Sequence, residues 1–279
     1  MNQGTEGNDG LTMRYTVLAS GSTGNSLLVE SGQTRVLVDA GLSAKKIEQL
    51  MEEREVKGAE LDAILITHEH SDHIKGVGAL ARKHDLPVYA NEKTWEALNK
   101  HLGELAEEKI KVMETGSVVS FGELQVESYP ISHDAAEPVG YCFYEGESKL
   151  SLATDLGYVS SKVKEKIIDS DAIILESNHD VEMLRMGKYP WNIKRRILGD
   201  TGHLSNEAAG VALGEILSGQ TETVYLAHLS RDHNLMDLAK LTVNNILEER
   251  GIAADERKVE LKDTYFDRPT RWDTLGRES

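Results

Sequence analysis

Residues 67–73 read Thr-His-Glu-His-Ser-Asp-His, and the rest of the chain is organised around them. They follow an apolar run, residues 61–66, whose length and β-branched content predict a buried strand. Apolar side chains then recur at helical spacing in residues 74–81, which predicts a helix over residues 72–84. A strand that passes through a loop into a helix places the loop side chains at the carboxyl edge of a sheet, where open α/β folds bind ligands. The segment therefore predicts a metal site.

The spacing of the side chains indicates two metal ions. His68 and His70 lie two residues apart in extended chain and can point toward the same cation. Asp72 and His73 follow the bend and can hold a second cation, and this mixture of imidazole and carboxylate suits zinc, manganese or iron. Alternatively, Ser71 caps the helix and the histidines are solvated. A cap does not account for three histidines within six residues, so we favour the metal site.

Composition limits the class of protein. The 279 residues contain no apolar stretch long enough to cross a membrane, and they begin with a polar, glycine-rich segment. We therefore expect a cytoplasmic protein without a membrane partner. We divide the chain into a disordered N-terminal tip (residues 1–12), a single domain (residues 13–265) and a C-terminal tail (residues 266–279). The single cysteine, Cys142, is expected to be a core residue in a reducing compartment.

The formal net charge of -16 argues against a surface that attracts nucleic acid everywhere. It does not exclude a phosphate substrate, because two divalent cations would keep the site itself positive. Between Glu182 and Asp200 the chain is basic instead, with aromatic residues among the positive ones. Such a mixture suits phosphates and stacked bases, although a solvated helix face is the alternative. The substrate-binding candidates in this stretch are Lys188, Trp191, Lys194, Arg195 and Arg196.

Two further features leave alternatives open. Residues 20–26 form a glycine- and serine-rich loop, which we favour as a hairpin connection. The alternative is a loop whose amides face a phosphate, and for this reason Ser22 and Asn25 are also substrate-binding candidates. Asp39, at the end of a predicted strand, is either a turn residue or a group that orients a ligand histidine.

With its His-x-His-x-Asp-His pattern, the chain resembles the metallo-β-lactamase superfamily. The resemblance covers residues 14–262 and implies an α/β (α+β) fold, a four-layer αββα sandwich with the site along one edge. The family's other ligands match three residues that follow predicted strands, His133, Asp155 and His228. By the family's pattern, one metal ion is held by His68, His70 and His133. The other is held by Asp72, His73 and His228, and Asp155 bridges the two.

The stretch between Asp155 and His228 is expected to decide the substrate, because this fold serves many hydrolytic reactions. Here Glu176 and His203 resemble the pair that donates a proton in the tRNA 3′-processing endonucleases, with Ser205 in place of a threonine. With residues 21–26 (Gly-Ser-Thr-Gly-Asn-Ser) and 230–234 (Ser-Arg-Asp-His-Asn) included, the chain resembles bacterial exonucleases of the YycJ/WalJ type. The resemblance implies a dinuclear phosphodiesterase, a 5′-to-3′ exonuclease on double-stranded DNA linked to DNA repair.

The expected chemistry is in-line attack of a metal-bound hydroxide on phosphorus. The leaving oxygen then needs a proton, for which we expect His203 to be the acid and His179 the reserve. The catalytic candidates are Asp72, His203, Glu176 and His179. We expect DNA rather than RNA as the substrate and specify no protein partner. The alternatives are a small-molecule hydrolase (a cyclic phosphodiesterase, thioesterase or lactonase) and a non-catalytic metal-stabilised module.

Overall fold

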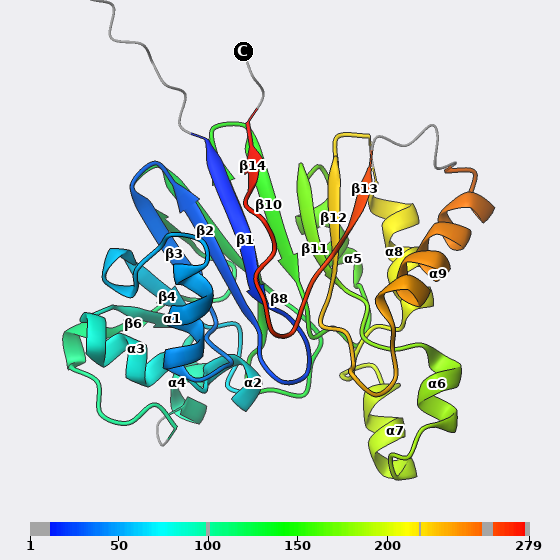
Figure 1. Ribbon diagram of the computed structural model, residues 1–279, viewed down its shortest axis with the longest axis horizontal. Coiled ribbons are helices and arrows are strands. Elements are labelled where there is room, and N and C mark those ends of the chain that lie inside the picture. Colours follow the sequence, from blue (N-terminus) through cyan, green and yellow to red (C-terminus); the bar gives the residue numbers. More distant parts are fainter. Residues whose placement is uncertain (1–11, 99–100, 218, 253–258, 277–279) are drawn as a thin grey trace, which may run out of the picture.

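Two β-sheets pack face to face, with helices on both outer faces, in the computed structural model of this chain (Figure 1). The structure describes residues 12–98, 101–217, 219–252 and 259–276. In order across the first sheet, the strands are β14 (Asp273–Leu275), β1 (Met13–Ala19), β2 (Ser26–Ser31), β3 (Thr34–Val38), β4 (Ala63–Leu65), β5 (Val88–Ala90) and β6 (Ile110–Val112).

The second sheet is also mixed. Its strands in order are β13 (Glu260–Asp263), β12 (Thr223–Ala227), β11 (Ala172–Glu176), β10 (Ser148–Ala153), β9 (Val139–Glu145), β8 (Leu124–Pro130) and β7 (Val118–Phe121). Strands β10 to β13 are parallel, as are β3 to β6 in the first sheet. Parallel strands present their carboxyl ends at one edge, and this edge carries the loops that were expected to bind metal.

Successive side chains of the strands point to the inner and the outer face of each sheet, and both faces are apolar. The core therefore has three layers. Tyr15 and Val17 of β1 contribute to the cluster between the sheets, together with Ile174 of β11. Separate clusters lie under the outer helices of each sheet. The helices are α1 (Ala44–Glu52), α3 (Val77–His84) and α4 (Glu92–Leu98) on the first sheet, and α5 (Ser161–Ile167), α8 (Asn206–Ile216) and α9 (Met236–Glu249) on the second. This layering confirms the expected αββα sandwich.

Three short helices lie near the loop edge: α2 (Ser71–Ile74), α6 (Val181–Met186) and α7 (Trp191–Ile197) (Figure 1). The expectation of one helix over residues 72–84 was wrong, because the chain breaks between α2 and α3. At the break, the Gly76 amide donates to the Ala40 carbonyl (2.7 Å), and a Cβ on Gly76 would lie 2.5 Å from the Leu42 carbonyl oxygen. This close approach requires glycine and packs α2 against the loop after β3.

The expectation of a C-terminal tail was wrong for part of residues 266–279, because β14 pairs with β1 along Met13–Tyr15. Asp273 of β14 accepts hydrogen bonds from Tyr225 Oη (2.7 Å) and Lys262 Nζ (2.8 Å). The pairing strand β1 and the residue Tyr225 are distant in sequence, so the local pattern did not reveal the strand. Of the predicted N-terminal tip, residues 1–11 lie outside the described residues. In the described part of the chain, no helix has the length and apolar character needed to cross a membrane.

Candidate metal centre

The side chains predicted as metal ligands converge at the loop edge of the sandwich. His68 and His70 lie in the loop after β4, and Asp72 and His73 lie on α2. The remaining three follow strands of the second sheet, β8, β10 and β12. The structure thus brings together all seven predicted ligands: His68, His70, Asp72, His73, His133, Asp155 and His228.

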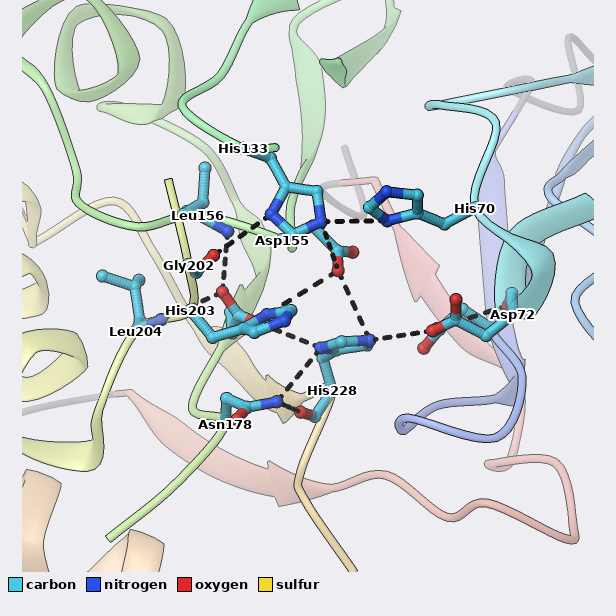
Figure 2. Close-up of polar contacts among 12 residues, drawn as sticks. His70, Asp72, His133, Asp155, Leu156, Asn178, Gly202, His203, Leu204 and His228 are labelled. Atoms are coloured by element: carbon cyan, nitrogen blue, oxygen red, sulfur yellow. Dashed lines mark hydrogen bonds and ion pairs between the residues drawn. The ribbon is translucent and has the colours of Figure 1, made fainter. Parts of the chain in front are cut away.

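The ligand atoms form two triads. One triad consists of His68, His70 and His133, and the other of Asp72, His73 and His228. In each triad, one ligand atom per residue lies within 4.8 Å of the other two. Asp155 lies between them (Figure 2). Its Oδ2 is 3.3 Å from His73 Nε2, and its Oδ1 is 3.4 Å from His228 Nε2 and 3.7 Å from His133 Nε2. One carboxylate can therefore reach a cation in either triad.

Several atoms of this cluster are buried without a hydrogen-bond partner among the described residues. They are Nε2 of His68, Nε2 of His228 and Oδ2 of Asp155. An unpaired buried polar atom costs about 1–3 kcal/mol, so three in one cluster need an explanation. Imidazole nitrogen and carboxylate oxygen are ligands of divalent transition metals, and cations bound here would satisfy all three atoms. The residues therefore fit the divalent metal ions that the fold implies.

The charges of the cluster favour a bound cation. Burial lowers the pKa of His228, but Asp155, Asp72 and Glu176 outweigh it and raise this pKa to about 10. Burial raises the pKa of Asp155, yet His228 and His73 hold it well below its usual value. The carboxylates therefore remain ionised at neutral pH, and the negative charge around His228 stabilises a positive species at its Nε2.

The backbone is left-handed at three residues that follow strands and lie at the cluster. The φ angles are 57° at Asp39, 62° at Asp155 and 56° at His228, after β3, β10 and β12. Residues other than glycine rarely adopt this conformation, and such exceptions concentrate at functional sites. The turn directs each side chain away from the line of its strand. Side chains from three separate strand ends can therefore point toward the same cluster.

Asp39 orients the ligand candidate His73 by binding its Nδ1. Its Oδ2 accepts a hydrogen bond from His73 Nδ1 (2.8 Å), and its Oδ1 accepts one from the Thr67 amide (2.9 Å). With Nδ1 held in this way, His73 directs Nε2 toward Asp155. Of the two readings of Asp39, the structure supports the orienting one.

Glu176 is fully buried and accepts hydrogen bonds from two histidines. Its Oε1 accepts hydrogen bonds from Nδ1 of His203 (2.8 Å) and Nδ1 of His228 (2.9 Å). Its Oε2 accepts hydrogen bonds from the amides of Leu156 (2.7 Å) and Leu204 (3.2 Å). Burial raises the pKa of Glu176, but these histidines and hydrogen bonds lower it to about 2, so Glu176 is a carboxylate at neutral pH.

The two candidate acids differ in their access to the site. His203 lines the cavity beside the ligand candidates, and 21% of its side chain is exposed. His179 is buried, does not line that cavity, and burial lowers its pKa to about 4. A neutral, enclosed imidazole is a poor proton donor, so the geometry favours His203 over His179.

The substrate-binding candidates lie in different places. The cavity has a volume of about 230 Å³, and both Ser22 and Arg196 line it. Lys188, Trp191 and Arg195 are exposed on the basic arm, by which we mean α6, α7 and the turn between them. Arg196 pairs with Asp134, the residue after His133.

Two of the substrate-binding candidates are placed where direct contact with substrate is not available. Lys194 is 8% exposed, and its Nζ donates hydrogen bonds to the carbonyls of Arg185 (2.6 Å) and Gly187 (2.7 Å). It therefore holds the turn of the basic arm. Asn25 is also buried and does not line the cavity, and its Nδ2 lies 3.2 Å from His73 Nε2, the atom that faces Asp155. The loop that carries Asn25 is a β1–β2 hairpin connection, as we favoured.

Sequence reasoning missed residues that fix the position of His228. Asn178 Nδ2 donates to the His228 carbonyl (2.8 Å), and Ser20 Oγ accepts from the His228 amide (2.7 Å). Both residues follow strands that end at this edge, β11 and β1, so the strand-end rule that found the ligands could have found them too.

Comparisons with known proteins agree with this geometry. Residues 34–229 match the family model described as the beta-lactamase superfamily domain. The chain is 50% identical over 259 residues to the exodeoxyribonuclease YycJ of Bacillus anthracis, which covers 93% of this chain and 98% of that protein. It is 46% identical over 246 residues to the exodeoxyribonuclease WalJ of Streptococcus pneumoniae serotype 2, which covers 87% of this chain and 91% of that protein.

Among solved structures, the metallo-beta-lactamase fold protein YhfI of Bacillus subtilis superposes with a TM-score of 0.71 at 17% identity. The match covers 95% of this chain and all of that one, and at this identity it shows the fold alone. Fold, cluster and sequence identity lead to the same conclusion: the chain belongs to the β-lactamase superfamily, in the family that includes the exodeoxyribonucleases YycJ and WalJ.

Proposed function

We propose that this protein is a metal-dependent phosphodiesterase of the cytoplasm that acts as a 5′-to-3′ exonuclease on double-stranded DNA in DNA repair. The observation that carries the proposal is the Glu176 carboxylate, which binds His203 in the cavity and the ligand candidate His228 at the same time. This contact couples a proton donor to a metal triad, as hydrolysis of a phosphodiester requires. The 50% identity with the exodeoxyribonuclease YycJ, over 93% of this chain, supports DNA as the substrate.

The residues present fit two divalent cations, one in each triad, with zinc, manganese or iron as candidates. When bound, such a pair activates water and stabilises charge on the phosphate. Asp155, between the triads, keeps the two sites at a fixed separation. Asp72, on the cavity wall, contributes a ligand oxygen and faces the space that a phosphate would occupy.

The protein itself delivers the proton to the leaving group. A bond forms between the water oxygen and phosphorus, and that water gives up one proton to solvent. The bond from phosphorus to the leaving oxygen breaks, and the leaving oxygen takes a proton from His203. Because Glu176 holds Nδ1, the nitrogen available for transfer is Nε2. The carboxylate also stabilises the positive charge of the imidazolium, which keeps the proton on His203 until the leaving oxygen develops charge.

The basic arm favours a polymer over a small molecule. Trp191 is 61% exposed, and the positive Lys188 and Arg195 are also exposed, outside the lining of the cavity. A small substrate would have no use for these side chains, whereas a nucleic acid that leaves the cavity can place phosphates and bases against them.

The test offers end-labelled single- and double-stranded DNA and RNA, with and without a 5′ phosphate, to protein whose metal content has been assayed. We expect release of nucleotides from the 5′ end of duplex DNA. His203→Ala should keep its metal ions and lose turnover by about 10²–10⁴-fold, and the matched control His101→Ala, at an exposed position, should not. Hydrolysis of bis-p-nitrophenyl phosphate without cleavage of any nucleic acid would show a small-molecule hydrolase instead.

A further inference from the structure

One wall of the cavity carries two apolar side chains. Helix α7 contributes Ile193 and Ile197, which lie one helical turn apart on the same face, and Tyr189 precedes them. The charged residue of this wall, Arg196, has its Nε paired with Asp134. The hydroxyl groups in the cavity belong to Ser22, Tyr189 and Ser230, and none of them belongs to a residue of α7.

Ile197 is joined directly to the loop that carries the proton donor. Its carbonyl accepts a hydrogen bond from the His203 amide (2.9 Å). Gly202 approaches the same carbonyl so closely that a Cβ there would lie 2.2 Å from the oxygen. The position of His203 is therefore fixed relative to the end of α7. An oxygen that receives a proton from His203 must lie within hydrogen-bond reach of it, and the sugar that bears this oxygen then lies beside the apolar wall.

We infer that Ile197, together with Ile193, discriminates deoxyribose from ribose. The inference rests on the proposed function and on the direction of cleavage. Water oxygen bonds to phosphorus and that water gives up one proton to solvent. The bond between phosphorus and O3′ breaks, and O3′ takes the proton from His203, which leaves a 3′-hydroxyl and a 5′-phosphate. In ribose the 2′-hydroxyl is attached to the carbon next to the one that bears O3′, so it meets the same wall.

The isoleucine side chains offer no hydrogen-bond partner to such a hydroxyl. At about 230 Å³ the cavity is smaller than the sites that enclose whole drug-sized ligands, so a sugar held beside His203 lies against the cavity lining. Burying a hydroxyl without a partner is unfavourable, and an apolar pocket rejects a substrate with one added hydroxyl by about a hundredfold. Ile197 is thus a specificity-determining residue that favours DNA.

The experiment measures kcat/KM for DNA and RNA of one sequence with the same preparation, so that the ratio does not depend on folded fraction or metal loading. Ile197→Thr keeps the branched shape and adds a hydroxyl. We expect the preference for DNA to fall from about a hundredfold to within about tenfold. Ile197→Val stays apolar and should keep the preference, as should Leu198→Thr at the exposed neighbouring position, which does not line the cavity.

The results separate this inference from the proposed function. Equal cleavage of DNA and RNA by the wild-type protein would overturn the inference, as would an unchanged ratio in both Ile197→Thr and Ile193→Thr, and in either case the nuclease itself would stand. Products with a 3′-phosphate would overturn it as well. Absence of cleavage of any nucleic acid by the metal-loaded wild type would overturn the proposed function.

Discussion

Replacing Glu176 with glutamine tests how one carboxylate serves two histidines. Each oxygen accepts two hydrogen bonds, Oε1 from His203 and His228 and Oε2 from two backbone amides. An amide group has one accepting oxygen and one nitrogen that only donates, so one pair of donors must face another donor. Backbone amides cannot give up their hydrogen, whereas imidazoles can move theirs from Nδ1 to Nε2. We therefore expect the glutamine nitrogen to face the two histidines.

This rearrangement affects both functions of the site. With a proton on Nε2, His228 cannot bind a cation through that atom, and loss of a group that orients a ligand lowers metal affinity by about 10–100-fold. His203 loses the carboxylate that stabilises its imidazolium, which removes general acid catalysis worth about 10²–10⁴-fold in turnover. Glu176→Gln is therefore expected to be inactive even when excess metal fills the site.

Asp39→Asn is the matched control, because Asp39 orients His73 but does not touch His203. Asparagine also tolerates the left-handed backbone at this position. We expect the same 10–100-fold loss, approximately, in metal affinity, with turnover restored by excess metal. The assay titrates metal into each variant and follows bound metal by elemental analysis alongside DNA cleavage. Full recovery of Glu176→Gln at saturating metal would refute the role of the carboxylate in proton transfer.

Three further outcomes are expected. Lys194→Met should lower the melting temperature and the activity, because Lys194 holds the turn of the basic arm. Arg195→Gln should leave the melting temperature unchanged and reduce the salt slope of DNA binding by about one. Equal melting temperatures of the two variants would contradict this. Burial raises the pKa of the Cys142 thiol, so a thiol reagent should label it only after denaturation, and rapid labelling of native protein at pH 8 would show that it is accessible. Chelation with EDTA should abolish activity and lower the melting temperature, and readdition of metal should restore both; full activity in chelated protein would exclude metal from the reaction.

The ligand candidates could be predicted from sequence because each stands where a strand ends. His133, Asp155 and His228 follow β8, β10 and β12, so the hydrophobic pattern that predicts the strands also predicts their places at one edge. Their distances to one another depend on left-handed backbone at two of these positions, which the pattern does not contain.

The role of a charged residue was less predictable than the position of a ligand. Lys194 and Arg195 are neighbours in one basic stretch, yet one is buried and the other exposed. The difference depends on which carbonyls the turn between α6 and α7 leaves open, and only the folded arm shows that Arg185 and Gly187 supply them. In the same way, β14 is recognisable only in the folded chain, where it pairs with β1 and binds Tyr225 and Lys262 of the other sheet.

Strand β14 also affects the order of assembly during translation. It pairs with β1 at the outer edge of the first sheet, although it is the last of the described strands in chain order. Until they leave the ribosome, the hydrogen-bonding edge of β1 remains open, and an open edge can pair with another nascent chain. Asp273 also ties the two sheets together through Tyr225, so the sandwich closes at this end only after residue 273 has been made.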